Sequence, residues 1–392
     1  MSPRRRALLA ALSGPLSGPL TGPLGLTMPA RAQMPSAPAA SRGTPPMADE
    51  DSIRPERHLQ FPRDHGAHSG ARIEWWYATG WLQPPGQAAP IGWQLTFFRS
   101  RTGLAATLPG RFAPRQLLFA HAAISDIAAG RHSHAQRLSR WSGDERWPEA
   151  HAQRADTGVV LGPWQLRRDA ASGRYQARLP APEAGFALDL ALQPTQPVLL
   201  QGQAGFSRKG PLPAQASHYY SLPHLAVTAQ LLRGSRRQTL TGSGWLDHEW
   251  SDELMPADAA GWDWIGINLH DGGALTAFVL RRRDGSVVWA GGSHRPAGGA
   301  VRAFPAGEVS FTPQREWTSP KSGARYPVKW AIVTPVGAFQ LEALLDNQEL
   351  DSSASTGAVY WEGLAALQDS GGRRVGLGYL EMTGRVAPLR LG

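Results

Sequence analysis

The sequence contains no cysteine. This absence excludes disulfide bonds, thiolate metal sites, a cysteine nucleophile and a lipoprotein anchor. Long apolar runs are also missing, because no stretch reaches the roughly 18 residues that span a bilayer. Apolar residues make up 42% of the chain and charged residues 18%, which is typical of a globular protein. We therefore expect a folded protein without stable membrane insertion.

Motifs of several enzyme classes are absent as well. The sequence has no G-x-S-x-G elbow, no P-loop and no G-x-G-x-x-G before a helix, so a serine hydrolase, an NTPase and a dinucleotide-binding protein are not expected. No nucleophile of another hydrolase class is recognisable either. His65 and His68 form an H-x-x-H pair without the glutamate and helix of zinc proteases, so hydrogen-bonded loop histidines are the favoured interpretation. The arginines are scattered rather than arranged in a basic stripe. We expect no metal, no other cofactor and no nucleic-acid partner.

The N-terminal residues have the pattern of an export signal. Arg4-Arg5-Arg6 precedes a modestly apolar stretch, Ala7 to Met28, and Ala30-Arg31-Ala32 matches an A-x-A cleavage site. We interpret residues 1–32 as a signal peptide of the Sec or twin-arginine type and residues 33–52, rich in Pro, Ala and Ser, as a flexible leader. This predicts a periplasmic or secreted protein; the alternative is a disordered cytosolic tail.

From residue 53 onward the pattern indicates β-strands throughout. Short segments bounded by Gly, Pro or Asp recur without a sustained period of 3.6, and 15 tryptophans could line an interior. The clearest segments are Arg72 to Leu82, Ile91 to Arg99, Leu117 to Asp126, Trp164 to Arg168, Phe186 to Leu192 and Leu275 to Arg283. We expect an all-β fold of the barrel or sandwich type.

The length of 392 residues favours two domains. A faint internal echo supports two similar units, since Leu95-Thr96-Phe97-Phe98-Arg99 resembles Leu275-Thr276-Ala277-Phe278 and the arginines after it. The strand pattern is interrupted between Ser251 and Asp258. We predict an N-terminal domain over 53–254 and a C-terminal domain over 255–392.

Acids embedded among aromatic residues are the most informative positions, because a buried carboxylate is costly unless paired, hydrogen-bonded or protonated. Alternation places Glu74 with Trp76, Asp247 with Trp245 and Glu249, Asp263 with Ile265 and Ile267, and Glu362 with Tyr360. Asp247 and Glu249 form a candidate acid/base pair. The plainer alternative for each acid is a structural ion pair with one of the many arginines.

A carboxylic acid desolvated by aromatic rings has a raised pKa and can serve as a general acid near neutral pH. Indole and phenol faces would stabilise a developing cation. This combination suits protonation of an electron-rich alkene, followed by water capture or cyclisation. His218 and Tyr219, in Ser217-His218-Tyr219-Tyr220-Ser221, could orient a water or a polar ligand group, and His121 lies in the apolar segment Phe119 to Ile124.

The same motifs carry a family resemblance. They follow, from about residue 60 to 386, the order found in the carotenoid 1,2-hydratase-like (hydroxyneurosporene synthase) family, and the exported branch linked to ABC transport systems is the better match. The motifs are His65-Gly66-Ala67-His68, Ile73 to Gly80, Phe119 to Ala122, Ser217 to Ser221, Gly244 to Trp250, Gly261 to Trp264, Tyr360 to Gly363 and Gly378 to Gly384.

The resemblance implies two lipocalin-like domains with an apolar cavity in or between them, and a cofactor-independent hydro-lyase acting on a polyene or isoprenoid. By this likeness Asp247, Asp263, His218 and Tyr219 are the expected catalytic residues, with Asp247 or Asp263 as the acid. The expected ligand-binding residues are Trp245, Glu249, Trp262, Trp264, Glu74, Trp76, His121 and Glu362. The alternative function is a periplasmic carrier of an apolar small molecule, serving an ABC transport system.

Overall fold

A computed structural model describes residues 51–103 and 114–389 of the chain. Within these residues all long elements are strands, and the helices are two single 3-10 turns, η1 (Arg63–His65) and η2 (Pro182–Ala184). No helix of the described residues has the length and apolar character to cross a bilayer. The prediction of an all-β fold is confirmed.

The first sheet has thirteen strands. They are β1 (Ile73–Gln83), β2 (Ile91–Arg101), β3 (Gln116–Asp126), β4 (Arg131–Trp141), β5 (Ala150–Ala152), β6 (Gly158–Leu161), β7 (Trp164–Arg168), β8 (Tyr175–Ala181), β9 (Phe186–Pro194), β10 (Leu199–Leu200), β11 (Phe206–Arg208), β12 (Ala216–Arg233) and β13 (Arg236–Ser251). Their spatial order is β4-β3-β2-β1-β13-β12-β9-β8-β7-β6-β5, and β10 and β11 pair with β12.

The second sheet has ten strands. They are β14 (Gly261–Leu269), β15 (Ala274–Arg281), β16 (Val287–Arg295), β17 (Arg302–Ala303), β18 (Ser310–Thr318), β19 (Arg325–Thr334), β20 (Gly337–Ala343), β21 (Glu349–Ser352), β22 (Ala358–Asp369) and β23 (Arg374–Met382). Their order is β17-β16-β15-β14-β23-β22-β20-β19-β18, with β21 on β22.

The two sheets share one topology. In each, the first strand pairs antiparallel with both the second and the last strand, β2 and β13 for β1, and β15 and β23 for β14. The echo seen in the sequence falls on β2 and β15, which hold the same place in the two sheets. All six segments predicted as strands are strands here, with ends shifted by at most two residues.

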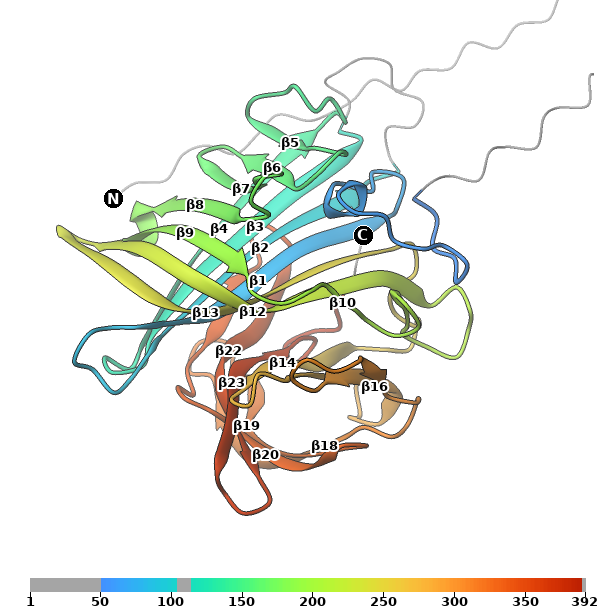
Figure 1. Ribbon diagram of the computed structural model, residues 1–392, viewed down its shortest axis with the longest axis vertical. Coiled ribbons are helices and arrows are strands. Elements are labelled where there is room, and N and C mark those ends of the chain that lie inside the picture. Colours follow the sequence, from blue (N-terminus) through green and yellow to red (C-terminus); the bar gives the residue numbers. More distant parts are fainter. Residues whose placement is uncertain (1–50, 104–113, 390–392) are drawn as a thin grey trace, which may run out of the picture. The chain divides into compact units, whose positions relative to one another are not determined.

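Each sheet curls around a separate apolar core (Figure 1). Even-numbered β1 residues such as Trp76 and Ala78 face the first core, and Ile265 and Ile267 of β14 face the second. Two near-barrel sheets of this kind confirm the prediction of a lipocalin-like pair of barrels. A third apolar cluster, which includes Tyr77, Trp245 and Trp264, joins the outer faces of the two sheets.

Hydrogen bonds tie the sheets together beside this cluster. β12 bulges between Leu222 and Leu225, where His224 takes a left-handed φ of 55°. That turn directs the His224 backbone N–H to Asn268 Oδ1 at 3.0 Å, and the Asn268 amide donates to Gly244 O at 3.0 Å.

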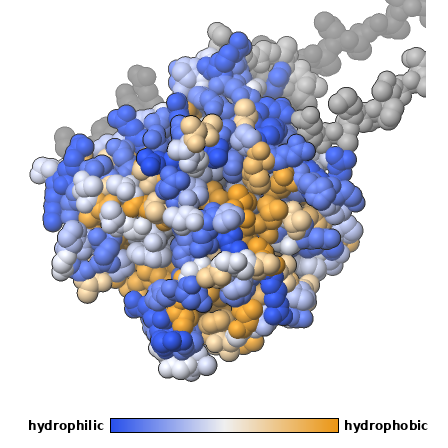
Figure 2. All heavy atoms as spheres, viewed as in Figure 1, coloured by the Kyte–Doolittle hydropathy of each residue, from blue (hydrophilic) through white to orange (hydrophobic). Residues whose placement is uncertain are grey.

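Apolar residues form a band across the middle of the face shown in Figure 2, with polar residues around it.

The predicted signal peptide and most of the predicted leader lie outside the described residues. The last two leader positions, Asp51 and Ser52, are described, and the buried Asp51 carboxylate accepts a hydrogen bond from the Gly70 N–H at 2.8 Å. Asp51 therefore belongs to the fold rather than to a free leader. Residues 252–260 connect the sheets, and the described residues pack as one unit, so the boundary at 254/255 stays a prediction.

Candidate functional site

A cavity of about 310 Å³ lies where the two sheets meet. Its walls come from β1, β2, β3, β12 and β13 of the first sheet and from β14, β15, β22 and β23 of the second. Apolar residues of the connecting segment and the C-terminal segment, such as Leu254 and Leu389, complete the lining. The volume is near the lower end of the range for ligand pockets, so it fits a small ligand or one end of a long polyene.

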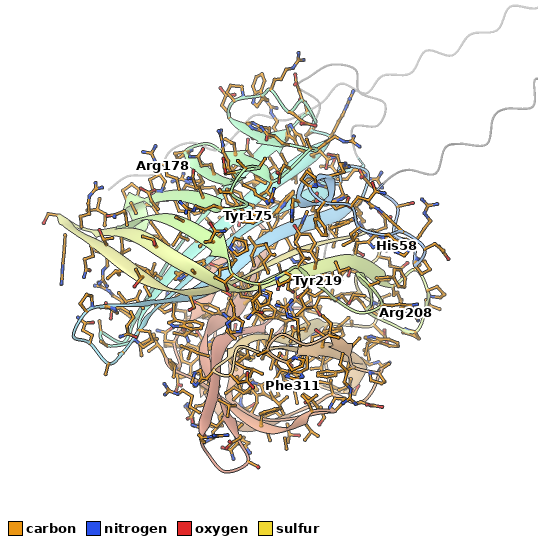
Figure 3. The ribbon with its side chains drawn as sticks, viewed as in Figure 1. His58, Tyr175, Arg178, Arg208, Tyr219 and Phe311 are labelled. Atoms are coloured by element: carbon orange, nitrogen blue, oxygen red, sulfur yellow. The ribbon has the colours of Figure 1, made fainter. Side chains whose placement is uncertain are left out.

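The first wall is set by alternation along β12 and β13. The outward face of β13 carries Trp245, Asp247 and Glu249, as predicted, because successive strand residues point to opposite faces. Tyr219 of β12 lies opposite Glu249 in the strand register. Figure 3 shows Tyr219 at the level where the sheets meet, whereas Tyr175, on β8 of the same sheet, lies farther from the second sheet. Acidic and phenolic groups therefore share this wall.

Asp247 is the central acid of that wall and is only 3% exposed. Burial raises the pKa of Asp247 to about 7, against three hydrogen bonds that favour its ionised form. The donors are Ser221 Oγ at 2.5 Å, Trp245 Nε1 at 2.7 Å and the Tyr219 hydroxyl. Asp247 can thus hold a proton at neutral pH, and three hydrogen bonds stabilise the carboxylate that remains when it loses that proton.

Glu362 and Glu381 stand opposite each other on β22 and β23, and both line the cavity. Burial and the neighbouring Glu381 raise the pKa of Glu362 well above its usual range. Burial, together with the charges of Asp247 and Glu249, raises the pKa of Glu381 to about 7. Two carboxyls in such contact resist simultaneous ionisation, so the pair retains a proton at neutral pH.

Aromatic rings surround these acids. Trp262 and Trp264 of β14 and Phe278 of β15 line the second wall, and the Trp264 ring packs edge-on against Tyr77 at 5.5 Å. Ring faces attract positive charge, so this lining can stabilise a cation formed in the cavity. The cavity therefore combines acids of raised pKa with aromatic rings; the catalytic roles expected of these residues stay predictions.

His121 also reaches the cavity but serves as a link between the sheets. Its Nδ1 lies 2.8 Å from the Tyr360 hydroxyl, and its Nε2 lies 2.9 Å from Ser355 Oγ. Burial lowers the pKa of His121 to about 3, so the ring is neutral and a poor acceptor of a further proton. The contact resembles a serine–histidine pair, but a histidine this hard to protonate is unsuited to activate a nucleophile.

Four predicted site residues, Asp263, His218, Trp76 and Trp245, do not line the cavity. Asp263 faces the second core, where its carboxylate pairs with Arg281 at 3.1 Å and Arg385 at 2.7 Å. His218 points away from its neighbour Tyr219, lies 5.5 Å from the Trp250 ring, and is neutral because burial lowers its pKa to about 4. These placements follow from strand alternation.

Trp76 is the third, since it faces the first core and stacks on His248 at 4.7 Å. Trp245 is close to the cavity but acts through its hydrogen bond to Asp247 rather than as part of the lining. The remaining predicted residues, Tyr219, Glu249, Trp262, Trp264, Glu74, His121 and Glu362, do line it together with Asp247.

Glu74 lines the cavity edge but is not a proton donor. Despite burial, the Arg99 guanidinium at 2.8 Å and the rings of His68 and His248, at 2.8 and 2.9 Å, hold the pKa of Glu74 well below its usual range. The second nitrogen of His68 lies 2.9 Å from Asp64, and its ring stacks on Trp250 at 3.6 Å. For Glu74 the structure therefore shows the alternative left open by the sequence, a structural ion pair with an arginine. It also shows His68 hydrogen-bonded, as predicted.

The same network contains a possible metal-ligand set. The ligating atoms of His68, Glu74 and His248 lie within 4.8 Å of one another. Each of them already has a hydrogen-bond partner inside the network, and the Arg99 guanidinium occupies the other Glu74 oxygen. A cation placed there would have to displace these bonds beside a fixed positive charge, so the geometry favours a structural role.

Comparison with known proteins gives the family. The model of AttH-like proteins matches residues 52–385. The chain belongs to the AttH-like family. A crystal structure of a candidate AttH from Nitrosomonas europaea is 45% identical, with a TM-score of 0.78, and the match covers 85% of this chain and 99% of that one.

A second solved structure is similar at lower sequence identity. The crystal structure of kievitone hydratase from Nectria haematococca is 13% identical, with a TM-score of 0.63, and the match covers 83% of this chain and 93% of that one. At this identity the match shows a shared fold. Among curated proteins there is no match. The AttH-like membership supports the sequence resemblance at this broader level, while a carotenoid substrate and a link to ABC transport stay predictions.

Glu381 and Lys209 line the cavity of this AttH-like protein but were not among the predicted site residues. Glu381 was quoted as part of a motif but not as a site residue, although Tyr379-Leu380-Glu381 is a further acid in an aromatic, apolar strand. Lys209 stands in a segment without strand alternation, where a lysine reads as solvent-exposed; it is in fact 6% exposed. Only the tertiary contacts place Lys209 against the cavity.

Proposed function

We propose that this AttH-like protein adds water to, or rearranges, a carbon–carbon double bond of an apolar unsaturated ligand by acid catalysis. The observation that carries the proposal is a set of three carboxyls in an aromatic cavity. Burial raises the pKa of Asp247 and of Glu381 to about 7, and it raises the pKa of Glu362 well above its usual range. General acids work best when their pKa lies near the operating pH.

Asp247 is the proposed proton donor. Its carboxyl transfers a proton to one alkene carbon as the π bond breaks, which leaves a cation on the other carbon and a carboxylate on Asp247. Ser221, Trp245 and Tyr219 are already in place to stabilise that carboxylate. Burial alone would make the acid reluctant to ionise, so these three donors keep its proton available for transfer.

Glu381 is the proposed base. Water attacks the cation to form a C–O bond, and its surplus proton passes to the ionised member of the Glu362–Glu381 pair. The charge of Asp247 contributes to the raised pKa of Glu381, so protonation of either acid favours ionisation of the other. One acid is then protonated while the other is ionised, which is the state that acid/base hydration requires.

The comparisons agree with this proposal without fixing the substrate. The fold is shared with a hydratase at 13% identity, and the sequence resembles carotenoid 1,2-hydratase-like proteins. A cavity of about 310 Å³ would take one end of a carotenoid or a whole smaller isoprenoid. Export to the periplasm, proposed from residues 1–32, would favour the smaller ligand, because such molecules are not confined to the inner membrane.

The mostly apolar lining also favours a second candidate, a carrier of a hydrophobic ligand that serves an ABC transport system. A carrier needs apolar surface and a polar anchor, and it has no use for acids held in protonated form. The two candidates therefore differ in what the acids contribute.

The test starts with native mass spectrometry and organic extraction of protein purified from its own host. The extracted unsaturated ligand is then incubated with the protein in D₂O. Hydration predicts a product with one deuterium fixed on carbon and one added water, and Asp247→Asn and Glu381→Gln should each slow its formation at least about 100-fold while still binding the ligand.

Asp189→Asn is the matched control, because Asp189 is exposed on β9, away from the cavity. A saturated lipid in the extract, or turnover by both cavity variants at the rate of the control, would remove the catalytic proposal and favour the carrier.

A further inference from the structure

Lys209 is a buried cation in the cavity wall that the proposed reaction does not use. It follows β11, is 6% exposed, and its Nζ lies 3.0 Å from Glu249 Oε1. The ammonium also lies 4.3 Å from the Phe278 ring centre and 4.9 Å from that of Tyr219. Lys209, Glu249, Tyr219 and Phe278 all line the cavity.

The Lys209 ammonium has more N–H donors than there are polar acceptors around it. An ammonium has three N–H donors, and among the described residues Glu249 is the one polar partner of Nζ. Two ring faces offer weak electrostatic contact but no lone pair. A buried charge with unused donors is costly, and a ligand oxygen in the cavity would satisfy them.

The charges around Lys209 favour a neutral ligand oxygen over a carboxylate. Glu249 already neutralises Lys209 and also accepts a hydrogen bond from Ser217. Asp247 and Glu381, near enough to influence each other's titration, add further acidic groups on the facing walls. A ligand carboxylate would meet this acidic surround, whereas a neutral carbonyl accepts a hydrogen bond from the ammonium without added repulsion.

The strand geometry also relates this position to the proposed acid. Glu249, the partner of Lys209, lies two residues from Asp247 on the same face of β13, which corresponds to about 7 Å. The Tyr219 side chain spans this interval, with its ring near Nζ and its hydroxyl on Asp247. An oxygen held by Lys209 would therefore place atoms a few bonds away beside the Asp247 carboxyl.

We propose that Lys209 is a specificity-determining residue that hydrogen-bonds a neutral carbonyl oxygen of the ligand, so the ligand class is an apolar unsaturated ketone or ester rather than a pure hydrocarbon. This inference rests on the proposed function, since it fixes the ligand's orientation toward Asp247.

The experiment compares three probes with the same heavy-atom framework apart from the carbonyl end: geranylacetone, the hydrocarbon in which CH₂ replaces its C=O, and the acid in which O⁻ replaces the methyl group of its acetyl end. Binding to the full-length protein is followed by tryptophan fluorescence, because Trp262 and Trp264 line the cavity. Wild type should bind the ketone at least about tenfold more tightly than the hydrocarbon, as expected for a hydrogen bond from a charged donor.

The decisive variant is the double change Lys209→Met with Glu249→Gln, which removes the ammonium without leaving a buried carboxylate unpaired. It should reduce the ketone-to-hydrocarbon affinity ratio to about one. Lys329→Met is the control, because Lys329 pairs with Glu342 outside the cavity and should keep the wild-type ratio. Thermal unfolding confirms that each variant is folded.

A wild-type ratio near one, a ratio retained in the double variant, or tighter binding of the acid than of the ketone would each overturn the proposal. Failure of all three probes to bind would overturn it as well. None of these results decides the proposed reaction, which the deuterium experiment judges separately.

Discussion

The raised pKa of Asp247 makes a prediction about stability as well as catalysis. In the fold this pKa rises from 3.8 to about 7, and the side chain is 3% exposed. Between these two values the folded state binds a proton that the unfolded state has lost, so the free energy of unfolding falls as pH rises through this window. At about 1.4 kcal/mol for each pKa unit, the full penalty reaches about 4 kcal/mol above pH 7.

Asp247→Asn removes this titration. Its stability relative to wild type should therefore increase by roughly 2–3 kcal/mol between pH 5 and pH 8, most of the window just described. Changes in fixed contacts with Ser221, Trp245 and Tyr219 shift the variant equally at both pH values, so the pH dependence isolates the ionisation. Above pH 7 wild type carries the full cost of burying the ionised carboxylate, and the variant does not have this cost.

The assay is urea unfolding of wild type and variant at pH 5 and pH 8, followed by far-UV circular dichroism. Asp189→Asn provides the control, since this exposed carboxylate stays in water and its removal should have the same effect at both pH values. An equal stability difference at the two pH values for Asp247→Asn would refute a raised pKa and, with it, the assignment of Asp247 as the acid.

Two further predictions concern the buried network of the first sheet. Glu74→Gln should lower the free energy of unfolding by about 3–5 kcal/mol, because it leaves the Arg99 guanidinium buried without its partner carboxylate. Urea unfolding at pH 7 measures this change, and a loss of less than about 1 kcal/mol would contradict the prediction. EDTA should leave the melting temperature unchanged, since the ligating atoms of His68, Glu74 and His248 are held in protein hydrogen bonds; a fall in melting temperature that Zn²⁺ reverses would instead establish a metal site.

Much of the fold could be predicted from local pattern. Segments such as Ile91 to Arg99 and Trp164 to Arg168 alternate and end at turn residues, and both are strands in the structure. Strand alternation also correctly grouped Asp247 with Trp245 and Glu249, because the two-residue period is a local property.

The candidate site was predicted less completely, and each difference has a physical reason. Asp263, like Asp247, stands near tryptophans in the sequence, but Arg281 and Arg385 pair with it and neutralise it within the second core. Glu381 becomes a site acid because β22 places Glu362 directly opposite it. Such pairings depend on which strands meet.

The sequence by itself determined the strand content, the two faces of each strand and the kinds of group available, since these follow from residue type and a period of two. The tertiary structure decided which faces meet. Two curled sheets pack through their outer faces, so Asp247, Glu362, Glu381 and Lys209 converge on one cavity, while Asp263, His218 and Trp76 turn into the cores. A pKa depends on what surrounds a carboxyl in space, and the groups that shift the pKa of Glu381 include Trp262 and Asp247, which lie more than a hundred positions away in the chain.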